Sequence, residues 1–184
     1  KPGYSEAAYN LGLTFSRPGR YQKSADAYKK AVKADHKFHE AYFNLGIAYG
    51  KLNRHKEAVS AYQGALRARR SYAAAWYNLG LSYRALNLWK KAAEAFEKAL
   101  QATPKYPEAA YNLALSLSDQ EEYGKAVEAY KRAIALAPSM TKAHYNLAWN
   151  YQKLDKPELA IDSYQKAIEL NPSKEEAHFN LGQA

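Results

Sequence analysis

Apolar residues recur along the chain at helical spacing, in two stripes within every 34 residues. In each segment, positions 4, 7, 8 and 11 form one stripe, and positions 17, 20, 21, 24, 27 and 28 form another. Residues three and four apart share one face of an α-helix, so each segment is predicted to form two helices. Position 1 of successive segments is Ser5, His39, Ala73, Pro107, Thr141 and Glu175.

Breaks in this pattern fall at the same place in each segment. A proline near position 32 ends the second helix in several segments, as at Pro104 and Pro138. Asp155 followed by Pro157 indicates a helix start with a capping side chain and a proline in the first turn. The breakers between the two helices, at position 15, are Gly19, Asn53, Asn87, Glu121 and Asp155.

A short marker, Asn-Leu followed by Gly or Ala, shows that the segments are true repeats. It recurs at intervals of 34 residues without insertion or deletion, beginning at Asn10 and ending at Asn180. The predicted repeats are 5–38, 39–72, 73–106, 107–140 and 141–174, with the start of a sixth at 175–184. Residues 1–4 resemble the tail of a preceding repeat, and no polar capping helix closes the array. We therefore expect a single array, 1–184, that is a fragment of a longer protein.

The third repeat carries a specific resemblance. Its residues resemble the tetratricopeptide repeat in the pattern Trp76, Leu79-Gly80, Tyr83, Ala92, Phe96, Ala99 and Pro104. The resemblance implies an all-α, right-handed superhelical solenoid of antiparallel helix–turn–helix repeats, five complete and a sixth partial. It also implies that the first helix of each repeat lines a concave groove.

Composition and candidate chemical groups exclude several classes of function. The sequence has no cysteine, which excludes disulfides and thiolate chemistry, and leaves the compartment open. Most of the five histidines occupy framework positions of the repeat, so we expect no catalytic residue, metal or cofactor. No apolar run approaches the ~20 residues that span a bilayer, so no membrane insertion is expected.

Three rows of the predicted groove lie outside the packing stripes: aromatic residues at position 5, asparagine at position 6 and mainly aliphatic residues at position 9. Exposed apolar surface of this extent marks an interaction site, and a carboxamide matches the N–H and C=O of a peptide backbone. The candidates are Asn10, Asn44, Asn78, Asn112, Asn146, Tyr77, Tyr111, Tyr145, Leu81 and Leu115. Two alternatives stay open: the asparagines could bond to a neighbouring helix, and the aromatic residues could pack between repeats.

Trp149 and the basic groove residues complete the candidate site. Trp149 replaces an aliphatic residue at position 9, where a partly exposed tryptophan would anchor an interface. Arg17, Lys51 and Arg84 lie in the first half of the chain, where residues 5–106 carry a net charge of +11 against −3 for residues 107–184. An acidic ligand segment is therefore expected to prefer the first three repeats.

These features predict a protein-interaction scaffold whose groove binds an extended peptide or a partner helix. One alternative is a substrate-recruiting arm of a multidomain enzyme, because the asparagine row resembles the repeats of O-linked N-acetylglucosamine transferases. Another is self-association through the uncapped ends, where Phe179 and Leu181 lie. The basic half could attract nucleic acid, but many of its lysines fall on outward helix faces, and nucleic acid is not expected as the partner.

Overall fold

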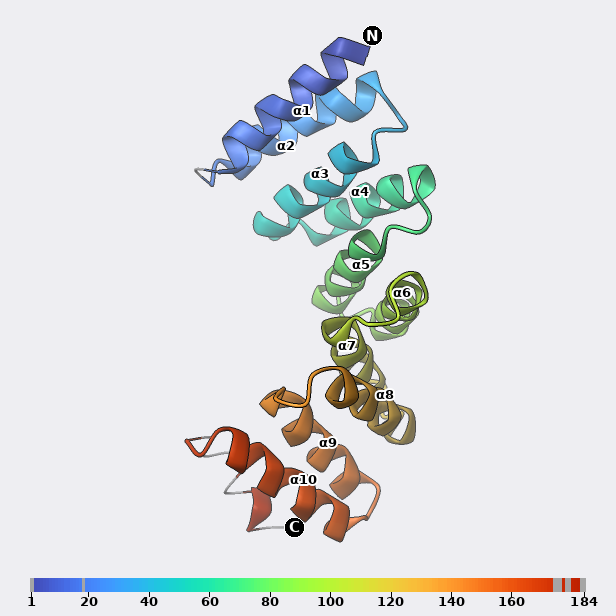
Figure 1. Ribbon diagram of the computed structural model, residues 1–184. Coiled ribbons are helices and arrows are strands. Elements are labelled where there is room, and N and C mark those ends of the chain that lie inside the picture. Colours follow the sequence, from blue (N-terminus) through green and yellow to red (C-terminus); the bar gives the residue numbers. More distant parts are fainter. Residues whose placement is uncertain (1, 18, 174–176, 178–179, 183–184) are drawn as a thin grey trace. The chain divides into compact units, whose positions relative to one another are not determined.

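The computed structural model is all-α over the residues that it describes, 2–17, 19–173, 177 and 180–182. The predicted array of helix hairpins is confirmed, and Figure 1 shows the two helices of each hairpin lying side by side. The helices are α1 (Pro2–Ser16), α2 (Tyr21–Ala34), α3 (His39–Lys51), α4 (His55–Ala68), α5 (Ala73–Ala85), α6 (Trp89–Ala102), α7 (Pro107–Ser118), α8 (Tyr123–Leu136), α9 (Thr141–Lys153) and α10 (Pro157–Leu170).

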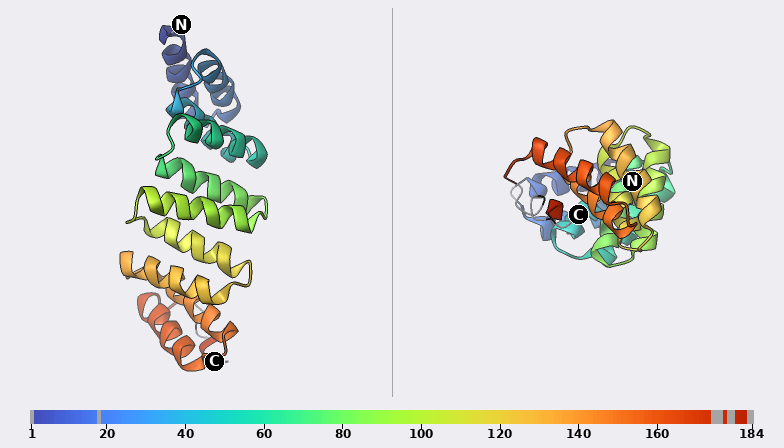
Figure 2. Two further views of the ribbon diagram at one scale, coloured as in Figure 1. Left: turned by 90° about the vertical axis from the view of Figure 1, so that its right-hand side faces the viewer. Right: turned by 90° about the horizontal axis from the view of Figure 1, so that it is seen from below.

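The chain divides into two compact units, Lys1–Ala102 with α1 to α6 and Thr103–Ala184 with α7 to α10. Within each unit, consecutive helices pack against each other, and the first helices α3 and α5 also meet. Figure 2 shows the same pairing of helices from two further directions. Each first helix therefore contributes one face to the core of its own hairpin and other faces to contacts with neighbouring repeats.

Every hairpin turns through the same backbone motif. The residue at position 15 has a positive φ, between 55° and 73°, in all five repeats. The next residue donates its backbone N–H to the carbonyl at position 11, as Arg54 does to Tyr49 at 2.9 Å and Leu88 to Tyr83 at 2.9 Å. This six-to-one bond is the Schellman arrangement, which ends a helix by satisfying a free carbonyl. The turn therefore explains why the predicted breaker recurs at position 15.

Small residues let large rings lie directly against the first helix of each hairpin. A Cβ built on Gly46 would come within 2.5 Å of the Tyr62 ring, so the ring lies where a larger side chain would stand. Tyr28, Tyr62, Phe96, Tyr130 and Tyr164 occupy the equivalent place and are buried. The alanines at position 27 are fully buried beside them. Close packing of this kind fixes the spacing of the two helices.

Two details differ from the sequence-based expectations. α1 begins at Pro2 rather than at Ser5, so residues 2–4 form its first turn, where a proline lacking an N–H is well tolerated. Asp155 does not cap α10: the N-cap is Lys156, it makes no side-chain capping bond, and Asp155 takes up the left-handed backbone of the turn. The start of the predicted sixth repeat lies largely outside the described residues.

Candidate functional site

The aromatic row at position 5 packs against the framework. In each complete repeat the ring at position 5 lies against the ring at position 24 of the same repeat, with centroids 5.6–5.9 Å apart. Tyr9 also meets Phe38, the last residue of its repeat, at 4.9 Å between ring centroids, and Phe43 meets Tyr72, the last residue of the second repeat, at 4.9 Å. The predicted residues Tyr77, Tyr111 and Tyr145 are thus half-buried or buried rings that pack within their hairpins.

Several asparagines at position 6 join neighbouring repeats. Asn44 Nδ2 donates to the hydroxyl of Tyr9 at 3.0 Å, and Asn146 Nδ2 donates to that of Tyr111 at 2.9 Å. Asn180 makes the same bond to Tyr145 at 2.8 Å. In each pair the tyrosine belongs to the preceding repeat. These asparagines therefore serve the framework, although each carboxamide keeps a carbonyl oxygen and a second N–H.

Asn78 and Asn112 orient differently. Phe43, which has no hydroxyl, precedes Asn78 in the row, and Asn78 Nδ2 donates instead to the Ala74 carbonyl of its own helix at 2.8 Å. Asn112 Nδ2 likewise donates to the Glu108 carbonyl at 2.8 Å and is buried. Asn10 is exposed. The six asparagines, identical in sequence, therefore occupy different environments.

A hollow of about 220 Å³ lies between α3 and α5, and we call it the α3–α5 hollow. It brings together three residues predicted from sequence: Lys51, Asn78 and Leu81. Leu81 is 36% exposed, which is high for a leucine beside a core. The other lining residues are Ile47, Gly50, His55, Tyr62 and Ser82. The hollow thus combines an apolar surface with a carboxamide and a cation.

His55 lines this hollow, whereas the sequence pattern placed it in the framework. Its Nδ1 is shielded from solvent and has no hydrogen-bond partner within the described part of the chain. Position 17 carries an aromatic ring in repeats 1, 3 and 4, at Tyr21, Trp89 and Tyr123. A histidine among these rings was the only signal in the sequence, because its place beside the hollow depends on how α3 and α5 pack.

Trp149 lies in the C-terminal unit, partly exposed, and is held from two sides. Tyr123 meets its ring edge-on with centroids 5.8 Å apart, and Lys153 Nζ lies 5.0 Å from its centroid. Lys142 Nζ lies 4.5 Å from the Tyr111 ring nearby in the same row of first helices. Leu115 is half-buried. A ring held by two neighbours in this way would lose little conformational freedom if a ligand packed on it.

The predicted basic residues do not form one cluster. Arg17 is exposed at the end of α1, and Lys51 is exposed at the rim of the α3–α5 hollow. Arg84 is half-buried, with its guanidinium carbon 5.8 Å from the Trp89 ring. Of the three, Lys51 is the one that lines the α3–α5 hollow.

The Tyr9 hydroxyl, which accepts the bond from Asn44, has a raised pKa and keeps its proton well above neutral pH. Burial is the largest cause that raises the pKa of Tyr9. Electrostatic interaction with Tyr28 and with Glu40 raises this pKa further, and the hydrogen bond from Asn44 lowers it in part. A protonated phenol can accept one hydrogen bond and still donate another. Among the described residues no group of three or more acidic, histidine or cysteine side chains could hold a metal ion. No described helix is long and apolar enough to cross a membrane.

Known proteins supply an independent view of this arrangement. Crystal structures of MamA and of YrrB resemble the chain, with TM-scores of 0.89 and 0.86 at 24% and 23% identity. MamA is matched over 96% of both chains, and YrrB over 94% of this chain and 89% of its own. Residues 41 to the end of MamA from Desulfovibrio magneticus RS-1 match at 24% identity over 94% and 97%, with a TM-score of 0.85. At these identities the likeness concerns the fold. No curated protein matches the sequence.

Family models cover most of the chain. Three models of the tetratricopeptide repeat match: one at residues 12–53, one at 43–107, and one twice, at 107–140 and 141–174. Proteins built from such repeats are typically interaction modules without catalytic activity. The sequence period, the hairpin fold and these matches agree, and the chain belongs to the tetratricopeptide repeat family.

Proposed function

We propose that this chain is a protein-interaction module without catalytic activity, and that its first helices bind an extended peptide segment of a partner. The observation that carries the proposal is the α3–α5 hollow, where exposed Leu81 lies beside Asn78 and Lys51. Peptide sites in general combine an apolar anchor with a few fixed polar groups, and this hollow has both.

Each lining residue has a defined part in the proposed binding. Leu81 and Ile47 would contact an apolar side chain of the peptide, while the remaining N–H and the Oδ1 of Asn78 would pair with a peptide group. Lys51 would attract a carboxylate. A single neutral hydrogen bond contributes only about 1 kcal/mol, so affinity depends on several such contacts together.

The comparisons are in keeping with a peptide ligand. YrrB is described as a tetratricopeptide repeat protein with an unusual peptide-binding site, and it shares this fold. Neither the comparisons nor the described residues favour a substrate-recruiting arm of a transferase. Self-association through the end of the array concerns Phe179, which lies outside the described residues.

Two leucines of similar exposure allow a matched test. Peptides selected on the wild-type protein from a random display library would be titrated against Leu81→Glu and against Leu88→Glu. Leu88 is 40% exposed and does not line the hollow. We expect Leu81→Glu to weaken binding by about tenfold or more and Leu88→Glu to leave it within about twofold. Asn78→Ala, which leaves the bonds between repeats intact, should weaken binding by about fivefold.

The proposal fails if no peptide is enriched, or if both leucine variants bind as the wild type does. Equal helicity by circular dichroism is required of all variants, because a misfolded protein would lose binding for another reason. Equal weakening by both leucine variants would place the ligand elsewhere on the N-terminal unit.

A further inference from the structure

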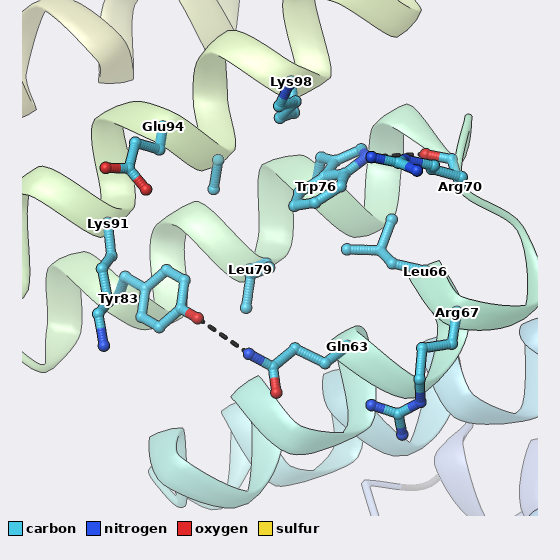
Figure 3. Close-up of a pocket in the computed structure, with 11 residues that line it drawn as sticks. Gln63, Leu66, Arg67, Arg70, Trp76, Leu79, Tyr83, Lys91, Glu94 and Lys98 are labelled. Atoms are coloured by element: carbon cyan, nitrogen blue, oxygen red, sulfur yellow. Dashed lines mark hydrogen bonds between the residues drawn. The ribbon is translucent and has the colours of Figure 1, made fainter.

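A second groove lies on the other side of α5, between α4 and α6, and has a volume of about 700 Å³ (Figure 3). We call it the α4–α6 groove. Leu66, Leu79 and Ala95 form its buried apolar floor, each less than a tenth exposed. Trp76 and Tyr83, both half-buried, add aromatic surface from α5. All of these residues belong to the N-terminal unit.

Two hydrogen bonds hold the aromatic walls of this groove. Trp76 Nε1 donates to the Arg70 carbonyl at 2.8 Å, and Gln63 Nε2 donates to the Tyr83 hydroxyl at 3.1 Å. Figure 3 shows both rings between the side chains of α4 and those of α6. Because these rings are already ordered, a ligand would lose little affinity to ordering them.

The rim of the groove is strongly basic. Arg67, Arg70, Lys91 and Lys98 are exposed around it, and Glu94 is the one acidic residue that lines it. No ion pair among the described residues joins any of these four cations to a carboxylate. Positive charges gathered around a hollow raise the local concentration of anions. The groove therefore combines an apolar floor with unneutralised positive charge.

The residue at position 26 explains why the groove is open in this repeat. In the preceding repeat this position is Gly64, and its Cβ would lie 2.4 Å from the ring of Tyr42, which packs onto α4. The third repeat has Lys98 at the same position and Trp76 at that of Tyr42. A ring cannot lie against the helix where a lysine side chain stands, so the space stays open.

We propose that the α4–α6 groove binds an acidic peptide segment that carries a large apolar side chain. The apolar side chain would occupy the floor beside Trp76, and the carboxylates would face the four cations. The buried floor of Leu66, Leu79 and Ala95 suits an apolar side chain of a peptide and offers no side-chain polar group to the edge of a nucleic acid base. This inference does not depend on binding in the α3–α5 hollow.

Trp76 provides a direct probe of the groove. The sequence has three tryptophans, so Trp89→Phe and Trp149→Phe leave Trp76 as the one fluorophore of this type. The ligand probe is a blocked synthetic peptide in which leucine and phenylalanine are flanked by glutamates, and the control peptide replaces glutamate by lysine. We expect a saturable shift of Trp76 emission with the glutamate peptide and none with the lysine peptide.

Charge reversal at matched positions supplies the decisive comparison. Lys91→Glu with Lys98→Glu removes two rim cations, and Lys23→Glu with Lys30→Glu removes lysines at the same repeat positions on α2. Lys23 Nζ also lies over an aromatic ring, 5.9 Å from Phe15, as Lys91 Nζ lies 6.0 Å from Tyr83. We expect the groove pair to weaken binding by about tenfold and the α2 pair by less than about twofold.

Four outcomes would overturn the proposal. The first two are an unchanged Trp76 emission with the glutamate peptide and equal weakening of binding by both charge-reversed pairs. The other two are a stronger response to a single-stranded oligonucleotide, and an emission shift that follows protein concentration and is accompanied by dimers in light scattering. The last two would assign the groove to nucleic acid and to a second copy of the chain. Leu81→Glu should leave the Trp76 response unchanged, which separates this groove from the α3–α5 hollow.

Discussion

At the level of single residues, position 15 shows how a backbone requirement limits the choice of side chain. Its φ is positive in all five repeats, a region that glycine adopts freely and asparagine tolerates. Repeats 1, 2, 3 and 5 have Gly19, Asn53, Asn87 and Asp155 there, whereas repeat 4 has Glu121 with a φ of 61°. Glutamate lacks the short polar side chain that makes this conformation tolerable, so the fourth turn is strained.

Replacing Glu121 by asparagine should therefore stabilise the protein. Glu121 is exposed, so the substitution removes no packing. We expect Glu121→Asn to raise the free energy of unfolding by about 0.5–1 kcal/mol, measured by urea denaturation. The reciprocal change, Asn53→Glu, should lower it by a similar amount. A neutral result for both substitutions would show that the turn is not strained.

At the level of elements, the row of asparagines joins one first helix to the next. Asn44 makes this bond to the Tyr9 hydroxyl, and the bond is absent where Phe43, which has no hydroxyl, precedes Asn78. The same residue type is therefore a bridge in one repeat and a candidate ligand group in another. This distinction selects Asn78 for testing peptide binding, because replacing a bridging asparagine would also disturb the framework.

A double-mutant cycle on Tyr111 and Asn146 would measure such a bridge. Tyr111→Phe removes the hydroxyl and keeps the ring that packs on Tyr130 at 5.9 Å. We expect each single substitution, Tyr111→Phe or Asn146→Ala, to lower stability by about 1 kcal/mol, with a coupling energy of about 0.5–1 kcal/mol. The converse substitution, Phe43→Tyr in a protein that keeps Asn78, should supply the missing hydroxyl and create a bridge between these two repeats. A coupling energy of zero would mean that solvent replaces the bond at no cost.

At the level of the whole molecule, buried tyrosines make the free energy of unfolding vary with pH in the alkaline range. Burial raises the pKa of Tyr62 well above its ordinary value, and it raises that of Tyr164 to about 12, with a further contribution from Tyr145. Burial also raises the pKa of Tyr9 and of Tyr72. In the unfolded chain these phenols ionise near pH 10. The folded state therefore holds protons that the unfolded state has already lost.

The sign of the effect follows from this difference in bound protons. The stabilising contribution is complete below about pH 10 and is lost as the pH rises towards 12. We expect the urea concentration at the unfolding midpoint to decrease as the pH is raised from about 9 to about 11.5. We also expect the phenolate absorbance of the folded protein to rise at a higher pH than that of the denatured protein. Tyr62→Phe should reduce the dependence, and Phe96 at the same position in repeat 3 shows that the ring fits without a hydroxyl. A midpoint independent of pH would contradict these shifts.

The two binding surfaces that we propose share one helix. α5 contributes Asn78, Leu81 and Ser82 to the α3–α5 hollow, and Trp76, Leu79 and Tyr83 to the α4–α6 groove. These two sets lie on opposite faces of a helix with 3.6 residues per turn. A first helix packed between neighbours on both sides can therefore serve two ligands from one short segment.

The sequence by itself determined the repeat period, the helix pairs, the turns at position 15 and the small residues that face rings. Each of these depends on residues within one hairpin, where backbone bonds span a few positions and the apolar period can be read directly. The tertiary structure alone decided which asparagines bridge, that the aromatic row packs inward, and that Lys51, Asn78, Leu81 and His55 share a hollow. It also decided that a groove stays open beside Lys98, whereas the Tyr42 ring fills the corresponding space beside Gly64. These properties depend on side chains brought together from different helices, because the volume between helices follows from the sizes of all the residues that meet there.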